Sequence, residues 1–220
     1  YLSNNTRDTQ KIIKKYGKIN DWNVENVTNM AKVFQNFTDF NEDISNWNVS
    51  NVRNMECMFS MTKLFDQPLD NWNVSSVTNM GGMFDDTYTF NQNINNWNVS
   101  CVTVMAAMFQ NTTAFNQPLN NWDVSNITNM VGMFNNASQF NQSLNNWNIS
   151  SVSNMSILFQ DTAVFNQPLN NWNIYNVKNM TYMFKGATLF NQSLNDWNVS
   201  NVTNMEGMFA NTISFNQPLN

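Results

Sequence analysis

Few side chains in this sequence have the chemistry that catalysis or tight metal binding requires. The 220 residues contain no histidine and two cysteines. The absence of histidine removes Ser-His-Asp and Cys-His mechanisms and the commonest metal ligand. Two unpaired cysteines do not build a structural zinc site, and no glycine-rich phosphate loop occurs. We therefore expect no enzyme activity, no catalytic residue, no metal site and no cofactor.

The remaining reactive groups have ordinary structural explanations. The acidic pairs Glu42–Asp43 and Asp85–Asp86 are isolated in the chain, and we interpret them as solvated turn charges. Cys57 and Cys101 lie two repeat units apart, which is about 10 Å if stacked units are about 4.8 Å apart. A disulfide requires Cα atoms within about 7 Å, so we expect two free thiols.

The chain is organised by a repeat of 25 residues. Tryptophan occurs only at this spacing, at Trp22, Trp47, Trp72, Trp97, Trp122, Trp147, Trp172 and Trp197. A repeat this regular indicates a solenoid in which each unit stacks on its neighbours. We predict two parts, an N-terminal capping segment over residues 1–20 and eight stacked coils over residues 21–220.

The apolar pattern within a unit predicts one strand and one helix. Trp122 and Val124 alternate with polar residues, as in a short buried strand. Thr128 is placed to cap a helix, and the capping box would be completed by Glu56 and Glu206 in two other units. The helix itself is indicated by apolar residues at i, i+3, i+4 and i+7, namely Met130, Met133, Phe134 and Ala137. The expected fold is an α/β repeat solenoid, leucine-rich-repeat-like, with a short parallel strand and a short helix in every coil.

Residues 1–20 differ from the repeats and predict a short capping helix. Thr6 or Asp8 would begin it and Gly17 would end it in the left-handed conformation. Its apolar side, with Ile12, Ile13 and Tyr16, would cover the first coil. Because the first residue is Tyr1 and the last unit has no closing cap, we expect that both ends are cut from a longer chain.

Composition excludes two further classes of function. The net charge is −5, and five of the ten basic residues, four of them lysines, precede the first unit, so the repeats carry no basic stripe for nucleic acid. No run of about 18 apolar residues is present, so we expect no membrane span.

The segment Phe190–Phe209, F-N-Q-S-L-N-D-W-N-V-S-N-V-T-N-M-E-G-M-F, resembles a known repeat. It is similar to the 25- to 26-residue unit of BspA-like leucine-rich-repeat surface proteins, which is also frequent in mycoplasma-type lipoproteins. The resemblance covers residues 21–220. It implies display at a cell or virion surface and adhesion or recognition, with no catalytic residues. The usual acid after the tryptophan is kept here only as Asp123, so a function that needs a row of carboxylates is not implied.

If the strand faces outward as in leucine-rich repeats, residues one and three after each tryptophan form the binding surface. The candidate residues are Asn98, Ser100, Asp123, Ser125, Asn148, Ser150, Asn173 and Tyr175. Tyr175 alone replaces serine with an aromatic residue of the kind enriched at interfaces, whereas neutral drift is the simpler explanation. The tryptophans themselves are expected in the core.

Two other columns predict structural roles. Asparagine stands seven residues after the tryptophan in every unit except at Val104, and we expect a ladder that satisfies backbone groups, weakened at Val104. Proline occurs in every second unit, at Pro68, Pro118, Pro168 and Pro218, which indicates duplication of a 50-residue pair.

Two classes of function remain open. The main hypothesis is a non-enzymatic recognition solenoid that binds a protein or glycan on another cell or particle. The alternative is a structural coat or spacer whose function is stacking, and end-to-end self-association is possible in either case. Variation between copies falls on the predicted helix side, as at Glu56, Val131 and Thr181, rather than on the predicted strand face.

Overall fold

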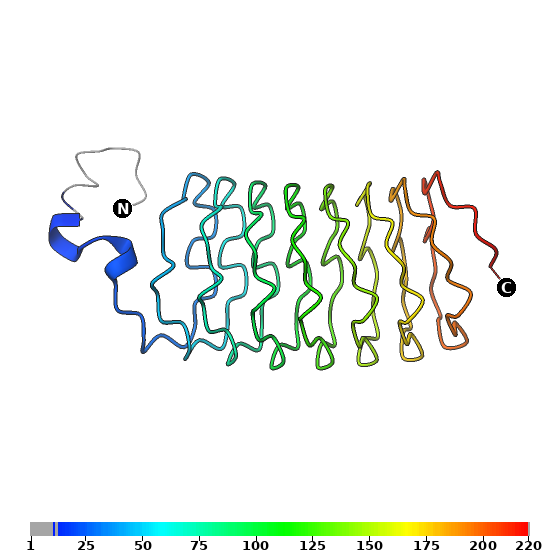
Figure 1. The fold of residues 1–220 in the computed structure, drawn as a ribbon, viewed down its shortest axis with the longest axis horizontal. Helices are drawn as coiled ribbons and strands as arrows, with labels where there is room; N and C mark the ends of the chain where they lie inside the picture. The colour runs from blue at the N-terminus through cyan, green and yellow to red at the C-terminus, as the bar shows by residue number, and fades with distance from the viewer. Residues whose placement is uncertain (1–10, 12, 220) are drawn as a thin grey trace.

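The computed structural model describes residues 11 and 13–219, and it shows the repeats as a row of stacked coils (Figure 1). Among these residues, the helix whose two ends are both defined is the 3-10 helix η1, Ile19–Asp21. Residue 11 and residues 13–16 are also helical, and isolated parallel bridges connect successive coils, from Asn29–Asn54 to Asn179–Asn204. No continuous strand forms in the described residues.

The predicted α/β architecture with a strand and a helix in each coil is therefore wrong. The stretch around Trp122 and Val124 is not a strand, and Thr128 begins no helix. The segment predicted as a helix makes hydrogen bonds to the next coil instead. The Gly132 N–H donates to the Ser156 carbonyl at 3.1 Å, and alternate residues in the other coils do the same.

The backbone of this segment repeats every four residues. Alternate N–H groups bond to the next coil, while the N–H groups between them close tight turns, as from Met133 to the Met130 carbonyl at 3.2 Å. Positive φ angles recur four residues apart, at 61° for Gly132 and 55° for Asn136. A four-residue period places i, i+3, i+4 and i+7 on one side, so it imitates the apolar pattern of a helix.

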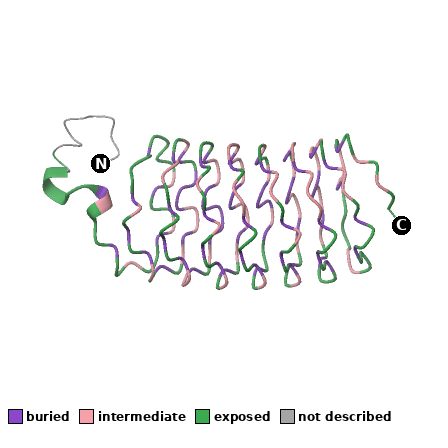
Figure 2. Cartoon of the chain, in the orientation of Figure 1, coloured by how far each residue is buried: buried purple, intermediate pink, exposed green. Residues whose placement is uncertain are grey.

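The burial predicted from that pattern is confirmed. Met130, Met133, Phe134 and Ala137 are all fully buried. Figure 2 shows buried residues recurring at equivalent places in the interior coils. The phenylalanines stack on their own copies, with ring centroids 5.7 Å apart between Phe109 and Phe134. The core is thus a set of continuous columns along the stack.

Tryptophan joins coils as well as filling the core. Trp47 to Trp197 are buried, and each indole N–H donates to a backbone carbonyl 28 residues earlier, as Trp122 does to Ile94 at 3.0 Å. Buried threonine hydroxyls also donate to a backbone carbonyl of the preceding coil, as Thr112 does to the Phe84 carbonyl at 2.7 Å.

The N-terminal segment caps the stack only in part. Gly17 ends the helical turn with φ 76°, and its N–H bonds to the Ile13 carbonyl at 2.9 Å, as expected. Ile13 and Tyr16 are exposed rather than packed on the first coil, whereas Ile19 is buried. The predicted helix start at Thr6 or Asp8, and Ile12, lie outside the described residues.

The alternation of proline has a structural counterpart in paired coils. Asn93 Oδ1 accepts the Asn95 N–H at 3.0 Å, whereas Pro118 stands at the equivalent place in the next coil. Asn95 Oδ1 accepts the Asn121 N–H at 3.0 Å, and its Nδ2 donates to Asn120 Oδ1 at 3.4 Å. The same network recurs 50 residues later, so coils are linked in pairs along this edge.

Candidate functional site

The predicted surface beside the tryptophans exists as a polar row, but its residues form turns rather than a strand. Asn98 Oδ1 accepts the backbone N–H of Ser100 at 3.1 Å and its hydroxyl at 2.7 Å. Asp123 and Ser125 do the same, and these hydrogen bonds lower the pKa of Asp123. Asn148 and Ser150 keep the backbone bond. The side-chain oxygens of the Asn and Asp residues thus accept hydrogen bonds within their own Asx turns. This structural role explains why the row is constant.

Tyr175 departs from this row as predicted from the sequence. Asn173 Oδ1 accepts its N–H at 3.1 Å, so the turn is kept, while 54% of Tyr175 is exposed. Its ring is available to a partner, but no second aromatic residue joins it at the equivalent position of another coil.

A second surface lies over the inter-coil hydrogen bonds, and we call it the ladder face. It consists of the residues 9, 10, 13 and 14 positions after each tryptophan, which alternate with the buried pairs of the same segment. In the third coil these are Gly81, Gly82, Asp85 and Asp86. The variation visible in the sequence lies here and not on a helix, because the four-residue period of this backbone resembles a helical one.

Side chains on the ladder face vary between coils, whereas the core columns and the row beside the tryptophans barely change. Nine residues after the tryptophan the chain has Ala31, Glu56, Gly81, Ala106, Val131, Ser156, Thr181 and Glu206. One position on, it has Lys32, Cys57, Gly82, Ala107, Gly132, Ile157, Tyr182 and Gly207. In contrast, the residue after the tryptophan is asparagine in every coil except at Asp123.

The coils fan out away from the ladder face. Equivalent rings of successive coils are nearly parallel. The distance between their centroids therefore measures how far apart two coils are at the place where the rings lie. The spacing is about 4.8 Å where backbones are hydrogen-bonded. It is 5.7 Å between Phe109 and Phe134, and 6.4 Å between Trp122 and Trp147. The ladder face is therefore on the inner, concave side of the stack.

Polar side chains on the ladder face are connected along the stack. Asn135 Nδ2 donates to Gln110 Oε1 at 3.3 Å, and Gln110 Nε2 donates to Asp85 Oδ1 at 3.2 Å. Burial and the neighbouring charge of Asp86 raise the pKa of Asp85 to about 6. The charge of Asp86 also raises the pKa of the Tyr88 hydroxyl.

Aromatic and charged residues meet at two places near this face. Lys63 Nζ lies 5.5 Å from the ring centroid of Tyr88, and Lys185 Nζ lies 5.0 Å from that of Tyr182. The Tyr182 hydroxyl donates to Glu206 Oε1 at 2.7 Å, which raises the pKa of Tyr182. These contacts restrict the positions that the two rings adopt.

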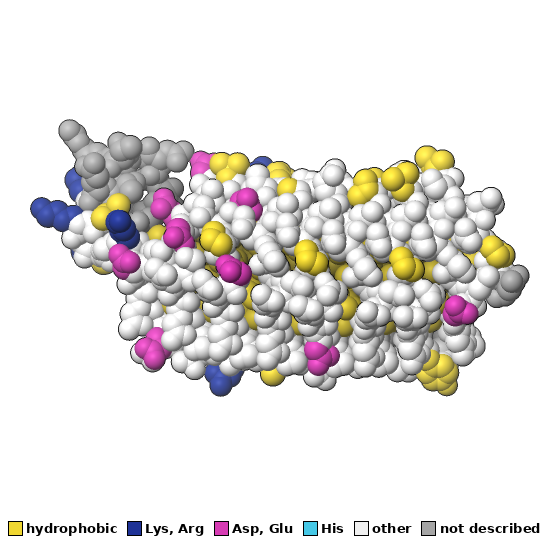
Figure 3. Space-filling view, in the orientation of Figure 1, with side chains coloured by type: hydrophobic (Ala, Val, Ile, Leu, Met, Phe, Trp, Pro, Cys, Tyr) yellow, Lys and Arg dark blue, Asp and Glu magenta, His cyan; other side chains and the backbone are white. Residues whose placement is uncertain are grey.

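Acidic residues are concentrated toward the N-terminal half of the stack. Residues 21–86 contain ten of the fifteen acidic side chains and three basic ones. On the side shown in Figure 3, acidic groups gather over the first coils and uncharged side chains cover most of the rest.

The asparagine column predicted as a ladder has a different local function. Asn129 Oδ1 accepts the N–H of Val131 in its own coil at 3.2 Å, while the bridge to the next coil uses the backbone. Val104 lacks this acceptor. The true side-chain ladder lies elsewhere: Asn116 Oδ1 accepts the Asn141 N–H at 3.0 Å and Gln142 Nε2 at 2.9 Å.

A family model described as Mycoplasma protein of unknown function, DUF285, matches residues 3–122 and 103–220. The chain belongs to this family. The match supports the mycoplasma-type repeat in the resemblance seen from the sequence. It does not support the leucine-rich-repeat part, because the coils of this DUF285 chain lack the strand and helix of that fold. No curated protein matches the chain.

The described residues of this DUF285 chain offer neither a disulfide nor a cluster of metal ligands. Cys57 and Cys101 are free thiols, and burial raises the pKa of Cys57. No cluster of three or more potential metal-ligating residues is found in the part of the chain that the structure describes. Within the same part, no helix has the length and apolar character needed to cross a membrane.

Proposed function

We propose that the chain is a non-enzymatic recognition protein, displayed at a cell or particle surface, that binds a protein or glycan through the ladder face. The observation that carries this proposal is the variation of ladder-face side chains between coils whose core columns and turns beside the tryptophans barely change. The resemblance to BspA-like surface proteins supports surface display.

The variation is informative because the fold constrains the other columns. The apolar columns are fixed by stacking, and the row beside the tryptophans is fixed by its turns. The ladder face also presents its side chains on the concave side at a spacing set by the backbone. Neighbouring coils can therefore hold different side chains, such as Gln110 and Asn135, in a rigid array against one partner.

The ladder face also matches the chemistry of a neutral, polar ligand better than the row beside the tryptophans. Gln110 and Asn135 each use one amide hydrogen in the chain that ends on Asp85, and each amide has a second hydrogen and further acceptor capacity. Amide groups and fixed tyrosine rings suit hydroxyl-rich or peptide surfaces. The Ser100 and Asn98 groups, by contrast, are paired with each other.

Two charge-matched triple variants separate the two surfaces. The ladder-face variant carries lysine at Gln110, Asn135 and Gln160, in the column where Lys185 occurs naturally. The control variant carries lysine at Ser100, Ser150 and Tyr175. Both are applied to a panel of immobilised glycans and intact cells, with folding checked by tryptophan fluorescence.

Selective binding that only the ladder-face variant loses supports the proposal. Loss in the control variant alone would assign binding to the row beside the tryptophans. If the unmodified chain binds nothing selectively, recognition is refuted and the structural alternative of a coat or spacer is the better explanation.

A further inference from the structure

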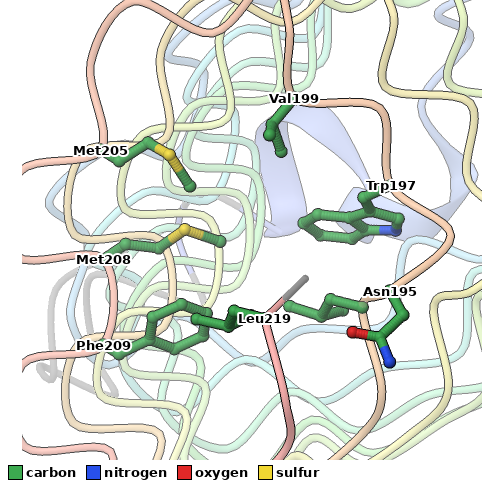
Figure 4. A pocket seen from close by; sticks show the side chains of 8 residues that line it. Asn195, Trp197, Val199, Met205, Met208, Phe209 and Leu219 are labelled. Carbon is green, nitrogen blue, oxygen red and sulfur yellow. The ribbon is translucent and has the colours of Figure 1, made fainter.

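The apolar hollow beside the eighth coil is made of core residues (Figure 4). Its lining includes Trp197, Val199 and Met205. One coil earlier, the counterparts of the last two, Ile174 and Met180, are buried under the next coil. The lining of the hollow is therefore explained by the stacking of coils. The polar chain on the ladder face has no such explanation.

This polar chain has a direction that its chemistry fixes. Asn135 Nδ2 donates to Gln110 Oε1 at 3.3 Å, and Gln110 Nε2 donates to Asp85 Oδ1 at 3.2 Å. An ionised carboxylate has no hydrogen to donate, so Gln110 must turn its NH2 group toward Asp85. The carbonyl oxygen of Gln110 then faces Asn135, which must donate in its turn. The charge of Asp85 therefore sets the orientation of an amide group in each of the two following coils.

The chain ends on Asn135. Gln160 is the next member of this column, but its Nε2 donates to Asp161 Oδ2 at 3.1 Å rather than to Asn135. Among the described residues, no donor reaches Oδ1 of Asn135. Asn135 is only partly buried, so this oxygen is the group that the chain presents at the surface.

The groups that face Asp85 are acidic or uncharged. In its own coil Asp85 lies beside the Asp86 carboxylate and near the Tyr88 hydroxyl, and in the preceding coil it lies near the Cys57 thiol. On the ladder face of the following coil, residues 106–111 include no charged side chain. Burial and the charge of Asp86 raise the pKa of Asp85 to about 6. A proton therefore binds Asp85 at mildly acidic pH.

We propose that ionised Asp85 locks the direction of this chain and that a proton on Asp85 releases it, which makes Asn135 a pH-dependent contact on the ladder face. A protonated carboxyl group has a donor as well as an acceptor. Gln110 and Asn135 are then free to reverse their amides together, and the reversed chain presents the NH2 group of Asn135 instead of its oxygen.

The consequence for binding rests on the proposed function of the ladder face. When Asp85 is ionised, the unpaired oxygen of Asn135 selects a ligand that places a hydroxyl or N–H donor at this coil. When Asp85 is protonated, the same position also accommodates a carbonyl oxygen. The acidity of the surroundings thus changes which ligand groups the ladder face accepts.

The test follows the side-chain NH2 resonances of Gln110 and Asn135 by NMR, in the ligand-free chain, from about pH 4 to about pH 8. Each resonance is assigned from the spectrum of a variant that lacks it, Gln110→Ala or Asn135→Ala. Asn135 is decisive because it lies two coils from Asp85, about 10 Å away. The hydrogen bonds connect it to Asp85 only through Gln110.

We expect both resonances to shift with one midpoint at about pH 6. The Asn135 shift should disappear in Asp85→Asn and in Gln110→Ala. Asp86→Asn is the matched control, because it removes a neighbouring carboxylate that accepts no hydrogen bond from either amide. In this control the shift should persist with a lower midpoint, since the charge of Asp86 raises the pKa of Asp85.

Two results would overturn the proposal. An Asn135 shift that survives Gln110→Ala would be a direct effect of the charge on Asp85, and an Asn135 resonance that does not change with pH would show that no lock exists. Because the spectra are recorded without a ligand, either failure leaves ladder-face recognition to be decided by the lysine variants. A chain that binds no ligand would likewise leave the lock to be decided by these spectra.

Discussion

Thr112 provides a direct measure of what the side-chain bonds between coils contribute. It is fully buried, and its hydroxyl donates to the Phe84 carbonyl at 2.7 Å. Thr112→Val keeps the branched shape and removes this bond. The Phe84 carbonyl still accepts the Thr87 N–H at 3.0 Å, so it is not left without a partner. The free energy of unfolding should therefore fall by the net value of one hydrogen bond, about 1 kcal/mol. A buried carbonyl left without any partner would cost more, about 3 kcal/mol.

Urea unfolding followed by circular dichroism measures this change. With a slope of about 2 kcal/mol per molar, the midpoint should fall by about 0.5 M. Thr112→Ala should cost about 1 kcal/mol more, because it also removes a buried methyl group. A Thr112→Val variant as stable as the parent, or one that loses about 3 kcal/mol, would refute the reasoning.

The position that Thr112 occupies, 15 residues after the tryptophan, also allows the opposite substitution in another coil. Ala137 and Ala187 occupy the equivalent place in two coils and cannot donate. Ala137→Thr would supply a hydroxyl for the Phe109 carbonyl, as Thr112 does for Phe84, and should raise the midpoint by a similar amount. If the substitution destabilises the chain, the column has no room for the side chain at this coil.

Three further changes test other parts of the stack. Val104→Asn should add the missing local acceptor and stabilise the chain by about 1 kcal/mol in urea unfolding. Gly207→Ala should destabilise it, because φ is 56° and the Tyr182 ring occupies the space of the new methyl group; in a Tyr182→Asn background the cost should fall to about 1 kcal/mol of backbone strain. The pKa of Asp85 is raised from 3.8 to about 6 in the folded chain, so the folded state holds a proton that the unfolded state has lost between these values. Stability should therefore fall as pH rises from about 4 to about 6. Asp85→Asn should remove this part of the pH dependence, and an unchanged profile would contradict the assignment.

The core was predictable because stacking acts on every copy at once. Columns such as the tryptophans and phenylalanines repeat without exception, and their burial follows from the repeat alone. The backbone was not predictable in the same way, because the four-residue period of turns gives the same apolar spacing as a helix. A signal against the helix was present: Gly132 and Asn136, four apart, are residue types that tolerate left-handed angles, whereas helices disfavour them.

This misassignment also determined where the binding surface was expected. A strand beside Trp122 would have made Asp123 and Ser125 an exposed functional row, but in a turn their polar groups bond to each other. A helix over the variable segment would have placed its variation on the convex side. Since the segment is instead the inner, hydrogen-bonded side, the same variation becomes the argument for recognition.

Left-handed residues on the ladder face strengthen that argument. Asparagine, aspartate and glycine adopt positive φ at little cost, yet Met61, Ile157 and Tyr182 also do so, at 61°, 53° and 55°. The cost is about 1–2 kcal/mol each, and it is highest in principle for the β-branched Ile157. Glycine stands at the equivalent position in other coils, so the fold does not require these side chains. We therefore interpret these left-handed residues, which carry a conformational cost on a variable, concave surface, as support for the proposed binding of a partner.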